Sequence, residues 1–295
     1  MEINWSQVLF NSVITGSLYL IGAVGLTLTY GLSKFPNFAH AELITLGAFI
    51  GYFVAVQLGL GLPFALLVAF LVCGIVGFLC YRVIFQPLAK RGASLIHLMV
   101  ASIAMSFILR HTIGAIWTWK PLHFTSTWSA FAVGPLRITG LWLWLIFAAL
   151  ALSLTIHFLL MNTKIGKAIR ASASNPELAL ASGINVDRVI WVTWFLGAGL
   201  AAIAGIFRGA DTQVWPMTGW DMILPIFAVT ILGGIGNFYG AIAAAFIIGI
   251  AENFGVTALI ALGVSTTYRI GIAFLILIVT LIVRPQGLAT LFRRA

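Results

Sequence analysis

Long stretches of this sequence contain no charged side chain, and they constrain the fold more than any other feature. After Glu2 one such stretch reaches Tyr30, and others cover Leu43 to Tyr81, Ile138 to Thr163 and Val189 to Phe207. A helix that crosses a membrane needs about 20 mainly apolar residues. Hydrophobic residues make up 61% of the chain and charged residues only 8%, against roughly 25% charged in a soluble domain. The sequence therefore predicts an integral membrane protein.

Helices fit these stretches better than a membrane β-barrel, whose strands alternate in polarity over about 10 residues. Glycine, proline and charged residues divide the chain into about nine apolar segments. These segments are 6–30, 39–58, 63–84, 95–116, 141–161, 189–209, 222–233, 240–254 and 268–283. We predict an all-α polytopic membrane protein with about 8–10 transmembrane segments in a single transmembrane domain, residues 1–295.

The positive charges predict an orientation in the membrane. The chain has a formal net charge of +9, and no basic stripe interleaved with aromatic residues suggests nucleic-acid binding. If each segment crosses once, one side collects most of the lysine and arginine residues, as cytoplasmic loops do. Those residues are Lys34, Arg82, Lys90, Arg91, Lys164, Lys167, Arg170, Arg188, Arg284, Arg293 and Arg294. We therefore expect an extracytoplasmic N-terminus and a cytoplasmic C-terminus.

No cation precedes Lys34, so the sequence lacks the basic start of a cleavable signal peptide, and we expect the first apolar segment to stay in the protein. Cys73 and Cys80 are the only cysteines. On one helix they would lie roughly 10 Å apart, which is too far for a disulfide. We expect both to act as small buried apolar residues.

Segments 222–233 and 240–254 are short for a membrane crossing, and a glycine-rich turn containing Gly233, Gly234 and Gly236 joins them, with Gly240 just beyond. Short segments interrupted by glycine are typical of broken helices beside a transport path. Two tilted helices joined by a tight hairpin explain the pattern equally well. Glycines four residues apart, at 47/51, 205/209 and 236/240, favour close helix packing.

The longest polar connection on the predicted cytoplasmic side covers residues 164–187. Lys164 to Ala173 reads as a short helix with its cations facing solvent. Asn175 can then cap a second short helix that begins at Pro176, carries Glu177 in its first turn and ends at Gly183. Asn185 or Asp187 can cap the next transmembrane helix, from about Val189. The residues thus predict an ordered knob, although a solvated linker with incidental caps is the alternative.

Polar residues also occur inside predicted spans. Asn37, His40 and Glu42 lie at the start of the second span. A carboxylate in a membrane segment is a candidate functional residue because exposing it to lipid costs several kcal/mol. Glu42 could pair with Lys34 or with a neighbouring helix, and we favour a structural or gating role over direct substrate contact. A His–Glu metal site would need a third ligand that the sequence does not show.

Further charged residues occur in or beside the later spans. They are Arg110 with His111 in the fourth span, Asp211 and Asp221 around a Gly-Trp loop, and Glu252 at the end of segment 240–254. Arg208 with Asp211 and Glu252 with Arg269 are plausible ion pairs. Pairing and a role at an outer gate both remain open for these groups.

Three stretches together resemble the permease subunits of branched-chain (hydrophobic) amino-acid ABC importers. The first is Asn37-Phe-Ala-His-Ala-Glu42 leading to Leu46-Gly-Ala-Phe49. The second is Gly166-Lys-Ala-Ile-Arg170-Ala with Asn175 and Ala181-Ser-Gly-Ile184-Asn. The third is Leu232-Gly-Gly-Ile-Gly236 with Gly240-Ala241. Their order and spacing match the family from the first span to the closing Arg284-Pro-Gln-Gly287, so the resemblance covers nearly the whole chain.

The resemblance implies a division of labour in which two permease subunits, typically two related chains, form the pathway through a bacterial-type plasma (inner) membrane. Two cytoplasmic ATPase subunits would drive transport with ATP and Mg, and an extracytoplasmic binding protein would deliver the substrate. Segment 164–187 matches the coupling segment that docks in a groove of the ATPase. Its candidate residues are Lys164, Gly166, Lys167, Arg170, Asn175, Glu177, Gly183 and Ile184. Pathway or gating candidates are Asn37, His40, Glu42, Gly233, Gly234, Gly236 and Gly240.

The chain has no G-x-x-x-x-G-K-[ST] phosphate-binding loop, so we expect no cofactor and no ATP hydrolysis on this subunit. Motifs of membrane enzymes, such as H-E-x-x-H or G-x-S-x-G, are also missing. An ion-coupled secondary transporter could use broken helices too, but it has no need of a docking knob. Similar permeases carry urea or short amides, so the solute stays open at this stage.

Overall fold

The computed structural model describes residues 3–124, 128–283 and 286–288 and confirms a polytopic helical membrane protein. Eight helical stretches in the described residues are long and apolar enough to cross a membrane, and a shorter apolar helix, α10, joins them. The helices are α1 (Trp5–Ser33), α2 (His40–Tyr52), α3 (Gly61–Cys80), α4 (Gln86–Lys90), α5 (Leu95–Ile116), α6 (Gly140–Asn162), α7 (Lys164–Ser174), α8 (Pro176–Ala181), α9 (Val186–Asp211), α10 (Trp220–Gly233), α11 (Phe238–Ala261) and α12 (Arg269–Val283). Short π-helical or 3-10 turns, Phe53–Gln57, Tyr81–Phe85 and Thr266–Tyr268, extend α2, α3 and α12.

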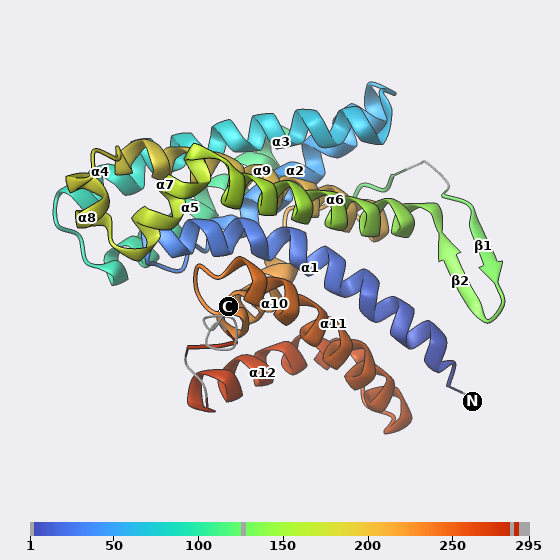
Figure 1. Ribbon diagram of the computed structural model, residues 1–295. Helices are drawn as coiled ribbons and strands as arrows, with labels where there is room; N and C mark the ends of the chain where they lie inside the picture. The colour runs from blue at the N-terminus through green and yellow to red at the C-terminus, as the bar shows by residue number, and fades with distance from the viewer. Residues whose placement is uncertain (1–2, 125–127, 284–285, 289–295) are drawn as a thin grey trace.

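The bundle has two distinct ends (Figure 1). One carries α4, α7 and α8, and we call it the α7 face. The other carries the start of α1 and an antiparallel hairpin of β1 (Ala130–Val133) and β2 (Leu136–Thr139), with Ala130 opposite Thr139. We call it the N-terminal face. The Asn4 side chain donates to the Pro135 carbonyl oxygen at 2.7 Å, which ties the chain start to the hairpin. The sequence had not suggested these strands.

The core of the bundle is formed by α1, α2 and α9, and the other long helices surround it. Buried residues make up 72% of the 18-residue membrane-spanning portions of α2 and α9, against 28% in α5 and 17% in α12. An apolar helix with so much exposed surface is suited to lipid or to another membrane subunit rather than to water. The core helices therefore hold the fold together, and the outer helices present its apolar surface.

Glycine lets the core helices approach one another at backbone distance, as the four-residue spacing predicted. A Cβ on Gly47 would overlap the backbone of Ala202, and one on Gly205 would overlap the carbonyl oxygen of Ile44. Gly25 of α1 faces the Gly197 carbonyl of α9 in the same manner. Close backbone contact replaces the hydrophobic drive that helices lack within lipid. Cys73 and Cys80 are buried and unbridged, as expected.

Two helices begin inside the bundle rather than at its ends. His40, at the start of α2, has its Nε2 atom 3.0 Å from the Gly22 carbonyl oxygen of α1. A helix rises about 1.5 Å per residue, so Gly22 lies roughly 16 Å from the end of α1. Residues 34–39 therefore turn back into the bundle before α2 starts. Gly219, which precedes α10, donates its amide to Thr45 Oγ1 at 3.0 Å, so α10 starts beside the first turns of α2.

The region predicted as two short segments resolves into one short and one long helix. α10 has 14 residues and follows the non-helical segment 212–219, which supports a broken crossing there. α11 has 24 residues, longer than the predicted 240–254, because apolar residues continue to Ala261. It runs beside α1, where a Cβ on Gly249 would meet the Ser12 carbonyl oxygen. The expectation of a second short segment was therefore wrong. Arg284, Arg293 and Arg294 lie outside the described residues.

Candidate functional site

Two short helices form an ordered pair on the α7 face. α7 begins after Thr163, whose hydroxyl accepts from the Gly166 amide at 3.0 Å. α8 begins after Asn175, whose side chain accepts from the Leu178 amide at 3.0 Å, with Pro176 and Glu177 in its first turn as predicted. These caps satisfy amides that would otherwise lack partners. The segment is therefore a knob and not a solvated linker.

The end of the knob also follows the predicted pattern. Gly183 has a φ of +82°, the left-handed conformation that closes a helix at low cost for glycine. Asn185 then caps α9 by accepting from the Arg188 amide at 2.9 Å, so α9 starts at Val186, earlier than expected. Of the two predicted caps, Asn185 is the one used. The α7–α8 pair is thus fixed to the bundle by α6 before it and α9 after it.

The outer surface of the pair combines positive charge with apolar side chains. Lys164, Lys167 and Arg170 are exposed, as are Asn175, Glu177 and Gly183, while Ile184 is half-buried. Leu178 and Leu180 are 64% and 58% exposed. On the inner side Gly166 is buried, and a Cβ there would overlap the Leu159 carbonyl oxygen of α6. Exposed leucines beside cations, on a rigid base, are suited to contact another protein.

Glu42 pairs with a neighbouring helix rather than with Lys34. The Nε and Nη2 atoms of Arg110, on α5, lie 3.0 and 2.5 Å from Glu42 Oε1, and Ser106 Oγ donates to the same oxygen at 3.0 Å. Both charged side chains are almost fully buried. Lys34 Nζ instead donates to the Ala173 carbonyl oxygen of α7 at 3.3 Å. An ion pair at this depth holds α5 to α2.

The pair lies where α2 and α10 begin. The Arg110 guanidinium stands 4.6 Å from the ring centroid of Trp220, the first residue of α10. Asn37 and His40 are also buried, and Asn37 Oδ1 accepts from the Ala39 amide at 3.1 Å. Within the described residues, Asn37 Nδ2 and Glu42 Oε2 have no hydrogen-bond partner. The structure thus brings all three polar candidates of the second span into one region.

The glycine candidates lie at the other end of α10, toward the α7 face. A Cβ on Gly240 would overlap the Gly233 carbonyl oxygen, so α10 and α11 touch backbone to backbone at their junction. Gly234 and Gly236 have φ values of +95° and +77°. Asn237 then caps α11 by accepting from the Gly240 amide at 2.9 Å. The turn is built for close approach, and it does not meet the Glu42 cluster.

Two of the remaining acidic residues have partners on other segments of the chain. Glu252 forms an ion pair with Arg269, as predicted. The proposed Arg208–Asp211 ion pair was wrong, because no salt bridge joins the two side chains in the described part of the chain. Asp211 Oδ1 instead accepts from Trp142 Nε1 at 2.7 Å. Over residues 3–124, 128–283 and 286–288, no three His, Cys, Asp or Glu side chains gather closely enough to hold a metal ion.

Sequence reasoning missed the partners that complete the buried cluster. Arg110 is a candidate from the sequence, but its separation of 68 positions from Glu42 gives no local pairing signal. Trp220 and Ser106 were not identified at all. The sequence signal for this ion pair is that two predicted membrane segments each carry a charged side chain of opposite sign. A charge inside a membrane segment needs a partner, because water is not available to it there.

Comparison with known proteins identifies the family. Residues 8–281 match the family described as "Branched-chain amino acid transport system / permease component". The chain is 32% identical to the probable branched-chain amino acid transport permease protein LivH of Methanocaldococcus jannaschii, over 97% of this chain and 93% of the relative. It is also 32% identical to the high-affinity branched-chain amino acid transport system permease protein LivH of Escherichia coli K12, over 96% and 94%.

A solved structure shows the same fold. PsaBC from Streptococcus pneumoniae, in complex with Fab, aligns over 98% of this chain and 96% of that chain, with a TM-score of 0.52 and 16% identity. At that identity the likeness concerns the fold alone. The chain belongs to the branched-chain amino acid transport permease family, as the sequence motifs predicted.

Proposed function

We propose that this family member is the membrane permease subunit of an ATP-driven importer for branched-chain or other hydrophobic amino acids. The α7–α8 pair carries the proposal, because a capped, exposed knob anchored in the bundle provides a rigid contact for a motor protein. Hydrolysis of ATP with Mg takes place on two cytoplasmic ATPase subunits. A second, related permease completes the pathway, and an extracytoplasmic binding protein delivers the amino acid.

The orientation follows from where the charges lie. Exposed basic residues of the α7 face, such as Lys90, Arg91, Lys164, Lys167 and Arg170, support a cytoplasmic position for that face under the positive-inside rule. The N-terminal face with its hairpin is then extracytoplasmic. This orientation places α7–α8 on the side where ATP is available. The coupling residues are Lys164, Gly166, Lys167, Arg170, Asn175, Glu177, Gly183 and Ile184.

Gating is assigned to the place where two helices start inside the bundle. Irregular backbone at membrane depth is tolerated where protein or a water-filled path satisfies it, and residues 34–39 and 212–219 are both irregular. Asn37, His40 and Glu42 are the gating candidates at this junction, where Glu42 holds α5 through Arg110 and His40 holds the start of α2 against α1. Gly233, Gly234, Gly236 and Gly240 form the hinge between α10 and α11. Motion of α7 would reach the junction through Lys34, which holds Ala173.

The test uses the permease pair, the ATPase and the binding protein reconstituted in lipid vesicles. Uptake of radiolabelled L-leucine should require ATP on the α7 side and should persist when ionophores collapse ion gradients. Urea and acetamide should not compete with leucine. Uptake that survives ATP depletion but stops with ionophores would instead identify an ion-coupled transporter. Competition by urea or acetamide would identify the alternative substrates.

A further inference from the structure

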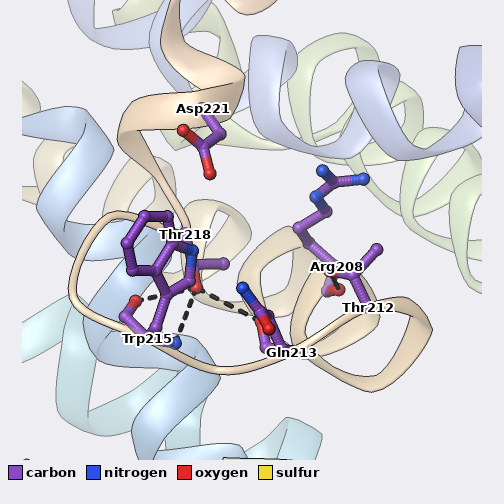
Figure 2. A pocket seen from close by; sticks show the side chains of 6 residues that line it. All are labelled: Arg208, Thr212, Gln213, Trp215, Thr218 and Asp221. Atoms are coloured by element: carbon purple, nitrogen blue, oxygen red, sulfur yellow. Dashed lines mark hydrogen bonds between the residues drawn. The ribbon is translucent and has the colours of Figure 1, made fainter. Parts of the chain in front are cut away.

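A small polar cavity opens where the chain enters the bundle between α9 and α10. Its volume is about 170 Å³. The lining residues are Arg208, Thr212, Gln213, Trp215, Thr218 and Asp221. Figure 2 shows the Arg208 side chain on α9 and the Asp221 side chain on α10 at the edge of this space, above the loop that joins the two helices. The cavity lies toward the N-terminal face, since α9 ends there.

The loop that forms its floor is held in place by several hydrogen bonds. Thr218 Oγ1 donates to the Trp215 carbonyl oxygen at 2.8 Å and accepts from the Trp215 amide at 3.0 Å. Val214 and Leu122 exchange two backbone hydrogen bonds of 2.8 Å, which fasten the loop to the segment after α5. The Gly219 amide binds Thr45. The cavity therefore has a fixed shape before any ligand arrives.

The two charged residues of the cavity differ from those elsewhere in the bundle. Glu42 is paired with Arg110, and Glu252 with Arg269. Among the residues that the structure describes, neither Arg208 nor Asp221 belongs to an ion pair. The cavity thus offers one guanidinium and one carboxylate, both half-buried. A charge that is partly removed from water without an ion-pair partner favours a ligand of opposite charge.

We propose that this cavity, which we call the Arg208–Asp221 pocket, binds the zwitterionic head group of the transported amino acid as it enters the permease. Arg208 binds the α-carboxylate, a geometry in which a guanidinium can donate two parallel hydrogen bonds. Asp221 binds the α-ammonium group, and the polar groups of Gln213 and Thr218 complete the lining. This inference rests on the proposed function, and it assigns a substrate subsite on the permease itself.

The two opposite charges also predict that the pocket selects zwitterionic ligands over simple acids and amines. A ligand with both charges satisfies both residues, whereas a simple acid or amine leaves one of them unpaired, and this penalty discriminates against it. The lining is mainly polar, so the pocket binds the α-carboxylate and α-ammonium groups that all amino acids share and does not recognise the aliphatic side chain. Choice among side chains then falls to other parts of the importer.

The first experiment measures ATP-driven L-leucine uptake by the complete reconstituted importer. Arg208→Gln and Asp221→Asn should each lower uptake at least about tenfold, while ATP hydrolysis stimulated by the binding protein stays near the wild-type rate. Arg208→Lys, which keeps the charge, should retain more uptake than Arg208→Gln. Arg137→Gln on the hairpin is the matched control, since it removes a guanidinium from the same face outside the pocket.

The second experiment measures whether a ligand occupies the Arg208–Asp221 pocket, and it does not depend on transport. Cys73 and Cys80 are buried, so a cysteine at position 208, introduced as Arg208→Cys, or at 221, introduced as Asp221→Cys, can be labelled selectively. A membrane-impermeant thiol reagent added on the N-terminal side should label each. In the Asp221→Cys variant Arg208 remains, so L-leucine and 4-methylpentanoate at high concentration should compete with the reagent more strongly than isopentylamine, which lacks the carboxylate. In the Arg208→Cys variant Asp221 remains, so L-leucine and isopentylamine should compete more strongly than 4-methylpentanoate, which lacks the ammonium group.

The outcomes separate this inference from the proposed function. If the wild-type importer takes up no amino acid, the proposed function fails. If it takes up leucine and both neutral variants do so at the wild-type rate, the pocket is not a substrate subsite and only this inference is overturned. Reduced uptake by the neutral variants together with equal labelling in the presence and absence of leucine would also overturn it.

Discussion

The α7–α8 pair and the junction of α2 with α10 are built by opposite means. The pair stands on the surface and is formed by local contacts, in which Thr163, Asn175 and Asn185 each cap the helix that follows. The junction is buried and depends on contacts between segments far apart in the chain, such as Glu42 with Arg110 and Gly219 with Thr45. The contacts of the α7–α8 pair act within one short segment, whereas each contact of the junction joins two helices of the bundle.

This difference predicts where substitutions act. Changes at the junction and in the glycine contacts around it should lower the stability of the whole bundle. Changes in the α7–α8 pair should leave the bundle intact and alter its interaction with the ATPase. The predictions below test that separation, beginning with the largest expected loss of stability.

Gly205→Val should prevent the accumulation of folded protein. Its Cβ would overlap the Ile44 carbonyl oxygen and crowd the Ala48 amide, so α9 and α2 would have to separate. We expect a loss of more than about 5 kcal/mol, comparable with the whole stability of many proteins. Size-exclusion chromatography in detergent measures the folded yield. Gly271→Val, on the exposed surface of α12 with open space around it, is the control; an equal yield from both variants would refute close packing at Gly205.

Glu42→Gln or Arg110→Gln should each destabilise the bundle by about 3–5 kcal/mol, because either leaves a buried charge without its partner. The double variant should lose less than the sum of the two. Denaturant titration in mild detergent, arranged as a double-mutant cycle, measures the coupling. Strictly additive losses would show that the two side chains do not act as a pair.

Asn175→Ala should cost about 1 kcal/mol, the usual value of a helix cap, and the loss should stay within α8. Hydrogen exchange of the backbone amides should accelerate over residues 177–181 and remain unchanged in α9. Asn185→Ala, which removes the next cap, is the matched comparison and should accelerate exchange at the start of α9. Faster exchange throughout the core after Asn175→Ala would mean that α8 is not a local unit.

Lys90→Gln should have the smallest effect, below about 1 kcal/mol. Lys90 Nζ lies 2.8 Å from Asp187 Oδ2, but both side chains are well exposed on the α7 face. Salt should weaken whatever contribution exists. Thermal unfolding at low and high ionic strength measures it, with Arg110→Gln as the buried counterpart. A shift as large as that of Arg110→Gln would contradict the division between surface and junction.

The sequence predicted the features that depend on neighbouring residues. Apolar length located the spans, and the Asn175-Pro-Glu177 pattern with Gly183 located α8 and its end, because caps act over three or four residues. It could not place the start of α2 inside the bundle, since the contact of His40 with Gly22 arises from tertiary packing. The union of Arg208 and Asp221 in one cavity depends on the path of residues 212–219, which no periodic pattern encodes.

The central claim, that the α7–α8 pair couples this permease to ATP hydrolysis, is tested by the amount of leucine imported per ATP hydrolysed in reconstituted vesicles. Gly183→Val and Arg170→Glu should lower this ratio at least about tenfold while hydrolysis continues and the bundle stays folded. Gly92→Val, at another glycine with positive φ on the same face, and Arg170→Lys should preserve it. A normal ratio in both Gly183→Val and Arg170→Glu would contradict the account.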